Sequence, residues 1–364
     1  MRSHATLALL VVCSPLVNQA FAGALFVDPA GLGDAPTIQG ALALAQDGDV
    51  LIVRPGHYVE DVVLDDLAVW IVAQQTGGTV VVEGMFQVRN LPRFDQVVLR
   101  DLELVPPSSD RIALTIEDCA GHVQILGCSA TGVVESGSAF GVSEAVHVAR
   151  AERVTAVDCS FTGSELSGLS FGPRSAPGLV AVDSRVALWG GEIVGADGSD
   201  GVLTGPFVPH DGGTGLVLMG SKCYASGVTV RGGDGGWDGD FLGLGGADGG
   251  DAVETQLGSF LYLVESTLTA GSGGASTVGS PGQAGAQFAG SGAVRVLELT
   301  SQSNDVPAFV PGSSFVPATF RGARGSVVEL YITLSPPPHL FDLDDAVSTS
   351  SPFVVSPPIK SNAG

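Results

Sequence analysis

Lysine is almost absent from this chain. Only two lysines, Lys222 and Lys360, occur in 364 residues, and 16 basic residues stand against 38 acidic ones, which gives a formal net charge of -22. Proteins that bind nucleic acids neutralise phosphates with clustered lysine and arginine. The composition therefore excludes a nucleic-acid partner. It also predicts that an anionic polysaccharide would be repelled unless a divalent cation bridged it to the protein.

Long apolar runs are missing too, apart from one at the N-terminus. An apolar run over residues 5–17 precedes Ala20-Phe21-Ala22, which has the small-x-small pattern of a signal-peptidase site. We therefore expect a signal peptide over residues 1–22 and a mature chain that begins at Gly23. No later run approaches the roughly 18 apolar residues that span a bilayer. We expect a secreted protein (extracellular, periplasmic or cell surface), with no membrane insertion in the mature chain.

Glycine, in contrast, is abundant. The chain has 52 glycines, about twice the share found in an average protein. Nevertheless 45% of the residues are hydrophobic, which excludes wholesale disorder. A chain of this length with so many turn formers and so much apolar content favours a solenoid, in which many short turns bury a continuous core.

A repeated phrase supports the solenoid. The segments "QILGCSATG", "TAVDCSFTG", "ALWGGEIVG", "YASGVTVRGG" and "YLVESTLTAG" follow one another along the middle of the chain. Aligning them places small or apolar residues in one slot, at spacings of 31, 32, 35 and 40 residues: Ala130, Phe161, Ile193, Val228 and Leu268. Repeats of this period indicate one supersecondary unit that stacks on copies of itself.

Each repeat unit reads as strands and turns. Short runs alternate apolar and polar residues, as in 145–148 and 261–264, and Gly, Ser, Asp and Pro clusters separate them. The units have no room for a helix of ten residues beside their strands. The sequence therefore predicts an all-β fold, a parallel β-helix of about eight coils between Val50 and Leu299.

The stretch "TIQGALALAQDGDVLIVRPGHYVED", residues 37–61, resembles the N-terminal turn of the pectin-lyase-like superfamily of right-handed parallel β-helices. The residues that carry the resemblance are Gly48, Asp49, Val53, Pro55, Gly56, Tyr58 and Glu60. The resemblance implies a short N-terminal capping helix, here Thr37 to Ala45, that closes the open end of the solenoid. We expect the right-handed parallel β-helix over residues 23–300, followed by a Pro-rich segment, 301–364, that caps the last coil or forms a tail and contains one strand, "SVVELYITL".

Enzyme signatures of this superfamily are incomplete here. Gly56-His-Tyr-Val-Glu60 resembles the first pectinesterase signature, but the later ones are absent, as is the Asp-Asp pair of polygalacturonases. Pro209-His210-Asp211 resembles part of the motif of alginate epimerases, with Val208 in place of its leading aspartate. We therefore expect no catalytic residues, a structural role for Tyr58 and Glu60, and a solvated turn at His210.

Loops of increasing length follow the registered strands toward the C-terminus, and insertions at one place in a repeat emerge on one face. One such loop holds Trp237 and five aspartates: Asp234, Asp238, Asp240, Asp248 and Asp251. Carboxylates and the carbonyls of Gly-rich backbone are calcium ligands. The loop therefore predicts either a calcium site or a merely solvated acidic loop, and Trp237 either stacks on a sugar or staples its own loop.

Four cysteines remain after the predicted leader: Cys119, Cys128, Cys159 and Cys223. Cys128 and Cys159 share a slot in successive units, within disulfide range, so we expect a bond between them in an exported protein. Cys223 aligns with Ile125, Ala156, Leu188 and Leu263. This position predicts a buried free thiol that acts as a small hydrophobic side chain.

Two classes of function fit these patterns. The first is an exported non-catalytic β-helix that presents Gly/Asp-rich loops for binding a polysaccharide or a cell-surface glycan. It requires no cofactor, and the calcium considered above is an optional ligand. The second is a polysaccharide lyase or hydrolase of the pectin-lyase-like superfamily with a calcium-assisted acidic site. A cleft with an arginine beside clustered aspartates would favour the enzyme, and a smooth loop face would favour the binding protein.

Overall fold

The computed structural model describes most of the chain between the predicted signal peptide and the end of the last coil. The described residues are 23–75, 77–107, 111–132, 143–164, 175–201, 209–239, 245–256 and 258–297, together with the backbone of three strands between 315 and 354. The predicted leader, residues 1–22, lies outside them. No helix in these ranges is long and apolar enough to cross a membrane.

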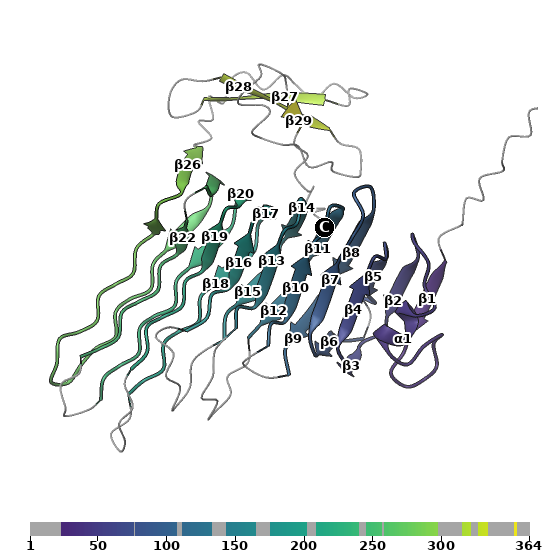
Figure 1. Cartoon of the computed structure of the whole chain (residues 1–364), viewed down its shortest axis with the longest axis horizontal. Coiled ribbons are helices and arrows are strands. Elements are labelled where there is room, and N and C mark those ends of the chain that lie inside the picture. The colour runs from purple at the N-terminus through teal and green to yellow at the C-terminus, as the bar shows by residue number, and fades with distance from the viewer. Residues whose placement is uncertain are drawn as a thin grey trace, which may run out of the picture.

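Three parallel sheets run the length of the molecule (Figure 1). Sheet A has ten strands: β1 (Ala24–Val27), β2 (Val50–Val53), β5 (Trp70–Ala73), β8 (Gln96–Arg100), β11 (His122–Leu126), β14 (Arg153–Val157), β17 (Arg185–Trp189), β20 (Lys222–Ser226), β23 (Phe260–Val264) and β26 (Ala293–Leu297). Sheet B has eight strands: β3 (Gly56–Val59), β6 (Val80–Glu83), β9 (Leu102–Val105), β12 (Ser129–Thr131), β15 (Ser160–Thr162), β18 (Glu192–Val194), β21 (Thr229–Arg231) and β24 (Thr267–Thr269). Sheet C also has eight strands: β4 (Val62–Asp65), β7 (Phe86–Arg89), β10 (Leu114–Glu117), β13 (Val146–Ala149), β16 (Leu179–Val182), β19 (Leu216–Met219), β22 (Val253–Thr255) and β25 (Phe288–Gly290).

The chain visits sheets A, B and C in turn, and each strand pairs with the strands one coil before and after it. This topology is a parallel β-helix, and the eight strands of sheets B and C confirm the predicted eight coils. Parallel crossovers are right-handed in nearly all proteins. Right-handed winding therefore stays our expectation for these coils.

The strand pairing confirms the inward stack and corrects one of its members. Ala130 pairs with Phe161, Phe161 with Ile193, and Ile193 with Val230 rather than with Val228. Val230 then pairs with Leu268, so the spacings become 31, 32, 37 and 38 residues. These side chains are buried in one hydrophobic core, with Leu268 partly buried at its end.

Each coil bends through single residues with a left-handed backbone. Between sheets A and B these are Asp101, Gly127, Asp158, Gly190, Gly227 and Glu265, and between sheets C and A they are Asp66, Asn90, Asp118, Arg150, Asp183 and Gly220. Positive φ suits Gly, Asn and Asp because other side chains crowd the backbone there. These corners explain why four of the five repeated phrases carry a Gly or Asp at a fixed offset from the strand; Glu265 occupies that position in the fifth.

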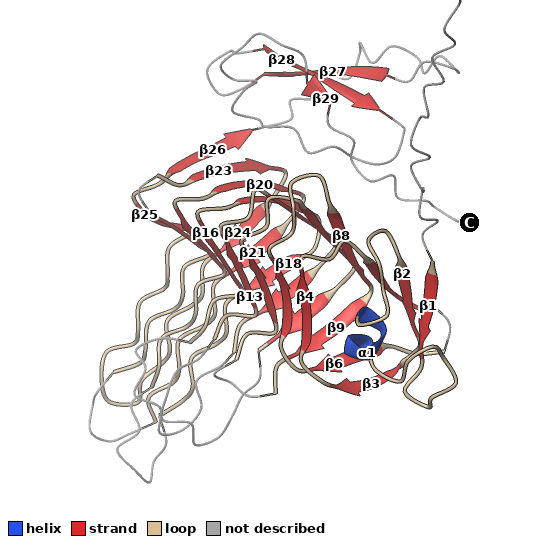
Figure 2. Cartoon of the chain, turned by 45° about the vertical axis from the view of Figure 1, so that its right-hand side comes forward, coloured by secondary structure: helices blue, strands red, loops and turns tan. Residues whose placement is uncertain are grey.

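A short helix, α1 (Ile38–Leu42), follows β1 and is shorter than the predicted Thr37 to Ala45. Thr37 accepts the Gly40 N–H with its hydroxyl at 3.0 Å, which is N-capping. The helix buries three residues, Ile38, Ala41 and Leu42, and contacts β1, β2 and β4 (Figure 2). A helix is thus present where the resemblance implies one, and its role in closing the end of the solenoid stays a prediction.

The four cysteines are free and buried, so the predicted bond between Cys128 and Cys159 is wrong. Cys128 and Cys159 each lie one residue after a left-handed corner, and both are buried in the core of the coil. The Cys159 thiol donates to the carbonyls of Ile125 and Val157, at 3.4 and 3.3 Å. Burial raises the pKa of Cys159 to about 11, which keeps the reactive thiolate rare.

Cys223 is a buried free thiol as predicted, and burial raises its pKa to about 12. Its slot differs, however, from the one that the sequence alignment assigned. Cys223 pairs with Val186 and Leu261, whereas the column of Leu188 continues through Ala225.

The Pro-rich segment contains three paired strands: β27 (Phe315–Arg321), β28 (Val327–Thr333) and β29 (Phe353–Val354). The first two are antiparallel, and β29 is parallel to β28. The single strand predicted at "SVVELYITL" is β28, and two partners that the sequence analysis did not predict accompany it.

Candidate functional site: the glycine arms

Three loops between sheets B and C leave the coils as pairs of extended arms. Outgoing arms cover residues 195–201, 232–238 and 270–276, and return arms cover 209–215, 245–251 and 280–286. We call these six segments the glycine arms. Figure 2 shows them as tan loops that run side by side away from the strands.

Arms of successive coils bond to each other at every third residue. The Gly198 N–H donates to the Asp234 carbonyl at 2.7 Å, and the Gly235 N–H donates to the Ser272 carbonyl at 2.8 Å. The return arms follow the same rule, with these N–H donors: Gly212, Gly215, Gly246, Gly249 and Ala252. A repeat of three residues is that of the polyproline II helix, which has no hydrogen bonds of its own and must find partners outside.

A second set of bonds joins the outgoing layer to the return layer. The Gly250 N–H donates to the Gly233 carbonyl, and the Gly271 N–H donates to the Gly250 carbonyl, at 2.8 and 2.9 Å. One continuous series of N–H-to-carbonyl hydrogen bonds alternates between the two layers. It runs through Ala196, Gly213, Gly233, Gly250, Gly271 and Gly285. The six arms therefore form a two-layered, hydrogen-bonded array.

Glycine is required where the arms approach each other. A Cβ on Gly235 would lie 2.1 Å from the Ala247 carbonyl oxygen, and a Cβ on Gly274 would lie 1.9 Å from the Gly236 carbonyl oxygen. Both distances are far below van der Waals contact. The same steric reason places glycine at every third position of collagen.

Aspartate carboxylates accept a further N–H group in six places along the arms. Asp197 Oδ1 accepts the Asp234 N–H at 2.7 Å, and Asp234 Oδ1 in turn accepts the Ser272 N–H at 2.8 Å. Four further aspartates do the same for the next coil: Asp200, Asp211, Asp248 and Asp251. In the triplets 232–234, 235–237 and 246–248, all three N–H groups are thus satisfied, two by carbonyls and one by a charged acceptor.

This arrangement gives the predicted calcium residues a structural task. Asp234 and Asp238 lie on an outgoing arm, Asp248 and Asp251 lie on a return arm, and Asp240 lies outside the described residues. In the described part of the chain, no group of three or more His, Cys, Asp or Glu side chains could hold a metal ion. Calcium binding by this loop stays a prediction that these contacts do not require.

Asp238 differs from the other arm aspartates because it is fully buried. Its Oδ2 accepts the Gly245 N–H and the Ser276 hydroxyl, both at 3.0 Å. It therefore ties together the outgoing arm, the return arm of the same loop and the outgoing arm of the next loop.

Asp234 also pairs with an arginine. Arg231 Nη2 lies 2.8 Å from Asp234 Oδ2 and 3.9 Å from Asp197 Oδ1. Burial works against ionisation of Asp234, but the hydrogen bonds from Ser272 and the charge of Arg231 outweigh it and lower the pKa of this carboxyl. The Asp234 carboxylate is therefore charged at neutral pH, as its acceptor role requires.

Trp237 lies in the row of exposed third positions, and 41% of its surface is accessible. The backbone N–H of Trp237 donates to Asp200 Oδ1. The indole ring packs over Gly239, where a Cβ would lie 2.8 Å from ring carbon Cζ3. The ring thus covers its own loop on one side, as one of the two predictions had it, and still offers surface to solvent.

His210 is buried, so the predicted solvated turn at Pro209-His210-Asp211 is wrong. His210 Nδ1 lies 2.8 Å from the Ser199 hydroxyl, and the His210 carbonyl accepts the Gly236 N–H. The neighbouring Asp211 carboxylate accepts the Asp248 N–H. The tripeptide is therefore a return arm of the array.

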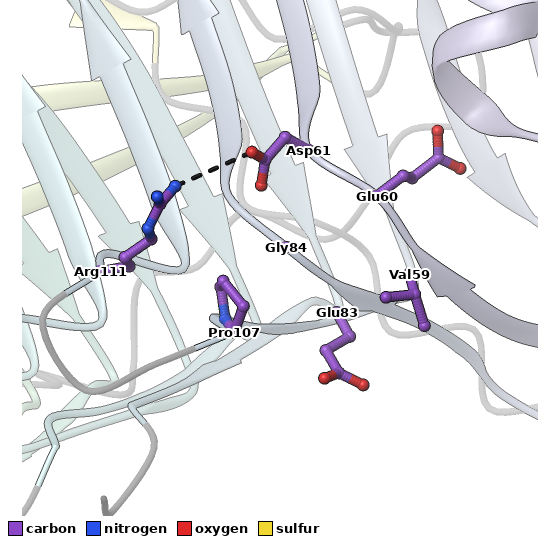
Figure 3. A pocket seen from close by; sticks show the side chains of 7 residues that line it. All are labelled: Val59, Glu60, Asp61, Glu83, Gly84, Pro107 and Arg111. Atoms are coloured by element: carbon purple, nitrogen blue, oxygen red, sulfur yellow. Dashed lines mark ion pairs between the residues drawn. The ribbon is translucent and has the colours of Figure 1, made fainter.

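A shallow cavity of about 400 Å³ opens at the same corner of the β-helix, near its N-terminal end (Figure 3). Its lining residues are Val59, Glu60, Asp61, Glu83, Gly84, Pro107 and Arg111. Arg111 lies 3.8 Å from Asp61, whose Oδ1 also accepts the Met85 N–H. Glu83 pairs with His57 at 2.8 Å.

Tyr58 and Glu60, the residues of the incomplete pectinesterase signature, have the structural roles expected of them. Glu60 turns toward α1 and accepts the N–H groups of Ile38 and Gln39 at 2.7 and 2.9 Å, where a carboxylate stabilises the start of a helix. Tyr58 is buried and donates its hydroxyl to the Arg54 carbonyl at 2.8 Å. Burial, with the nearby charges of Asp28 and Glu60, raises the pKa of Tyr58 to about 12.

The sequence analysis did not identify Asp197 and Asp200, and considered Asp211 only within Pro209-His210-Asp211, because it grouped aspartates by their number in one loop. The signal that points to them is the triplet spacing of small residues and Asp in "GADGSDG", "GGDGGWDG" and "GGADGGD". A period of three identifies the array as clearly as a period of two identifies a strand.

No family model matches the chain, and no curated protein matches it either. Among solved structures, YbhC of Escherichia coli is 12% identical, with 68% of this chain and 74% of that chain covered and a TM-score of 0.27. A pectin methylesterase from carrot is 11% identical, with 75% and 88% covered and a TM-score of 0.33. At these values the strand pairing described above, and not the likeness, establishes the fold.

Proposed function

We propose that the protein is an exported, non-catalytic β-helix whose glycine arms present a rigid binding face to a polysaccharide or a cell-surface glycan. The observation that carries this proposal is the use of the arm carboxylates. Six of them accept backbone N–H groups of the next coil, which fixes the array and leaves their outer edges in rows. Rigid presentation lowers the entropy lost on binding.

Trp237 supplies the apolar contact of this face. Aromatic side chains contribute large contact areas and stack on apolar faces of ligands. The carboxylate rows would repel an acidic glycan, so calcium enters the proposal as a bridging ion for such ligands. A neutral glycan needs no bridge.

Binding of the full-length protein to pectate, alginate, xylan and neutral glucans, with and without calcium, tests the proposal. Trp237→Ala is expected to weaken binding about tenfold or more, as loss of a central aromatic contact does. Trp70→Ala is the matched control, because Trp70 is 46% exposed on sheet A, away from the arms. Equal effects of the two substitutions would refute the assignment of the face.

The alternative, a polysaccharide lyase or hydrolase, has one observation in its favour. The cavity of Figure 3 places Arg111 beside Asp61, with Glu60 and Glu83 on the same lining. A lyase needs a base and a cationic clamp, and a hydrolase needs two carboxyls across the scissile bond. Each acid here already has a protein partner, which supports the non-catalytic proposal. Unsaturated products or new reducing ends that disappear in Asp61→Asn would establish the enzyme instead.

A further inference from the structure

The outer face of sheet A is covered in its middle and open at both ends. In this face, Val98, Gln124, Thr155, Ala187, Tyr224 and Tyr262 form one column in strand register. Strand alternation places them outside the coil, because the residues beside them, such as Leu261 and Leu263, fill the core. Yet Thr155 is 6% and Tyr262 is 7% exposed, whereas Trp70 at one end of the column is 46% exposed and Arg295 at the other end is exposed.

Composition shows the same distinction. The next outward column runs from Arg100 through Leu126, Val157, Trp189 and Ser226 to Val264, so four of its six members are apolar, and the Trp189 and Tyr224 rings lie 5.0 Å apart. Sheet B differs, because from β12 onward most of its outward positions are polar, and Thr131, Ser160, Glu192 and Thr267 among them are exposed. Parallel strands that are apolar on both faces are those covered on both faces.

A basic row borders this apolar area. Arg153, Arg185 and Lys222 are neighbours in the strand register, and His122 precedes them in the same row. Such a row is unusual in a chain with 16 basic residues and two lysines. A partner that fits this surface is amphipathic and carries negative charge.

The chain itself supplies a segment of this kind. β26 is the last strand of sheet A, so residues 298–364 leave the β-helix at the sheet in question. In β27 and β28, the pairing register groups alternate residues on one face of the strand pair, all of them apolar: Val316, Ala318, Phe320, Val328, Leu330 and Ile332.

Size and charge agree with this occupant. β27 and β28 have seven residues each, which corresponds to about 23 Å, and the column from β8 to β23 spans five coil spacings, about 24 Å. The segment also carries the run Asp342-Leu-Asp-Asp345, opposite in sign to the basic row.

We propose that residues 298–364 fold back onto the outer face of sheet A, with the apolar face of the β27–β28 pair on the column from Val98 to Tyr262 and the run 342–345 along Arg153, Arg185 and Lys222. The segment is then an integral side layer of the β-helix, neither a tail nor a cap on the last coil. Docking leaves the glycine arms, which emerge between sheets B and C, free for binding.

Cutting the full-length protein at an engineered protease site tests whether the C-terminal segment stays bound to the coils. With a specific protease site inserted between Thr300 and Ser301, the released fragment is expected to stay with the coils in gel filtration at low salt. Arg185→Glu with Lys222→Glu is expected to weaken its retention about tenfold or more, because two attractions become repulsions. Adding Asp342→Arg and Asp344→Arg is expected to restore it. Arg89→Gln with Arg111→Gln, two losses of charge away from sheet A, is the control and should retain the fragment.

Hydroxyl-radical labelling of the uncleaved protein gives a readout that does not depend on the cut. Trp189 and Tyr262 should be labelled slowly and Trp70 quickly, with the difference lost in the Arg185→Glu, Lys222→Glu variant. Separation of the wild-type fragment at once, or equal retention by the charge-reversed variant, would overturn the proposal. A dimer that loses the fragment on dilution would assign the surface to a second copy and would overturn it as well.

Discussion

At the scale of residues, the pair formed by His147 of β13 and Glu144, which lies just before that strand, shows how local charge stabilises one coil. His147 Nδ1 lies 2.5 Å from Glu144 Oε1, and both side chains are largely buried. The hydrogen bond with Glu144 raises the pKa of His147 above its ordinary value. Burial alone would raise the pKa of Glu144, but the hydrogen bond with His147 outweighs it and lowers this pKa.

The pair predicts a pH window for stability. The raised histidine pKa stabilises the fold below pH 6.5 and loses its effect as the pH rises through the folded-state value. The lowered glutamate pKa stabilises above pH 4.5 and loses its effect as the pH falls. The melting temperature of His147→Asn is therefore expected to lie furthest below wild type between these values and to converge with it once the pH has risen through the folded-state pKa of His147. Glu144→Gln should show the same window, and a constant difference across pH would contradict the assignment.

Residue-level predictions from the sequence were right about burial and less reliable about register. Val228 and Val230 both face inward, because residues two apart in a strand share a face. Alternation could not distinguish them. The left-handed corner does: Gly227 aligns with Gly127 and Asp158, so Val228 lies in the slot of Cys128 and Cys159. The common slot of these two cysteines was therefore correctly predicted, and only their bond was not.

At the scale of elements, the glycine arms resolve the conflict between a glycine-rich composition and an ordered structure. Extended glycine segments lose much conformational entropy on folding. The array offsets this loss with hydrogen bonds from arm N–H groups to backbone carbonyls and to aspartates of the preceding coil, which satisfy the middle loop most completely. Rigid arms follow from this packing, although glycine alone would indicate flexibility.

Neighbouring positions in one arm predict opposite responses to an added side-chain atom. Gly274→Ala places a methyl group 1.9 Å from the Gly236 carbonyl oxygen, so the arms must separate, and we expect a loss of about 1–3 kcal/mol in the free energy of unfolding. Ala275→Ser adds one atom at an exposed third position and should change it by less than about 0.5 kcal/mol. Denaturant unfolding measures both, and similar losses would contradict the array.

The sequence predicted the arrangement of the loops less well than that of the strands. The parallel strands could be predicted, because alternation and turn residues are local signals. The aspartates were interpreted as a potential cation cluster because their partners, N–H groups about 37 residues away, are invisible in a linear sequence. Only the triplet period of Gly and Asp could have indicated that these residues lie in rows along stacked arms.

At the scale of the whole molecule, the fold is a one-dimensional stack. Each strand pairs only with the coil before and the coil after it, and the arms extend the same neighbour relation outward. In such solenoids, stability is close to a sum of repeat and neighbour contributions. The net charge of -22 acts in the opposite direction, because carboxylates in successive coils repel one another.

The stack predicts how a local defect spreads, and amide hydrogen exchange of the full chain can follow it. In the wild type, the N–H groups of the arm over 232–238, and those of Gly271, Ser272 and Gly274 in the next arm, should be protected like those of strands because they are bonded, whereas ordinary loops exchange quickly. Gly274→Ala should accelerate exchange in those arms and in the coil that carries them. Residues 24–105, several coils away, should keep their wild-type rates because only neighbouring coils share contacts. Ala275→Ser serves as the matched variant and should change neither region. Uniform acceleration along the chain would instead show that the molecule opens as one unit, and rapid exchange of wild-type arms would remove the rigid face on which the binding proposal depends.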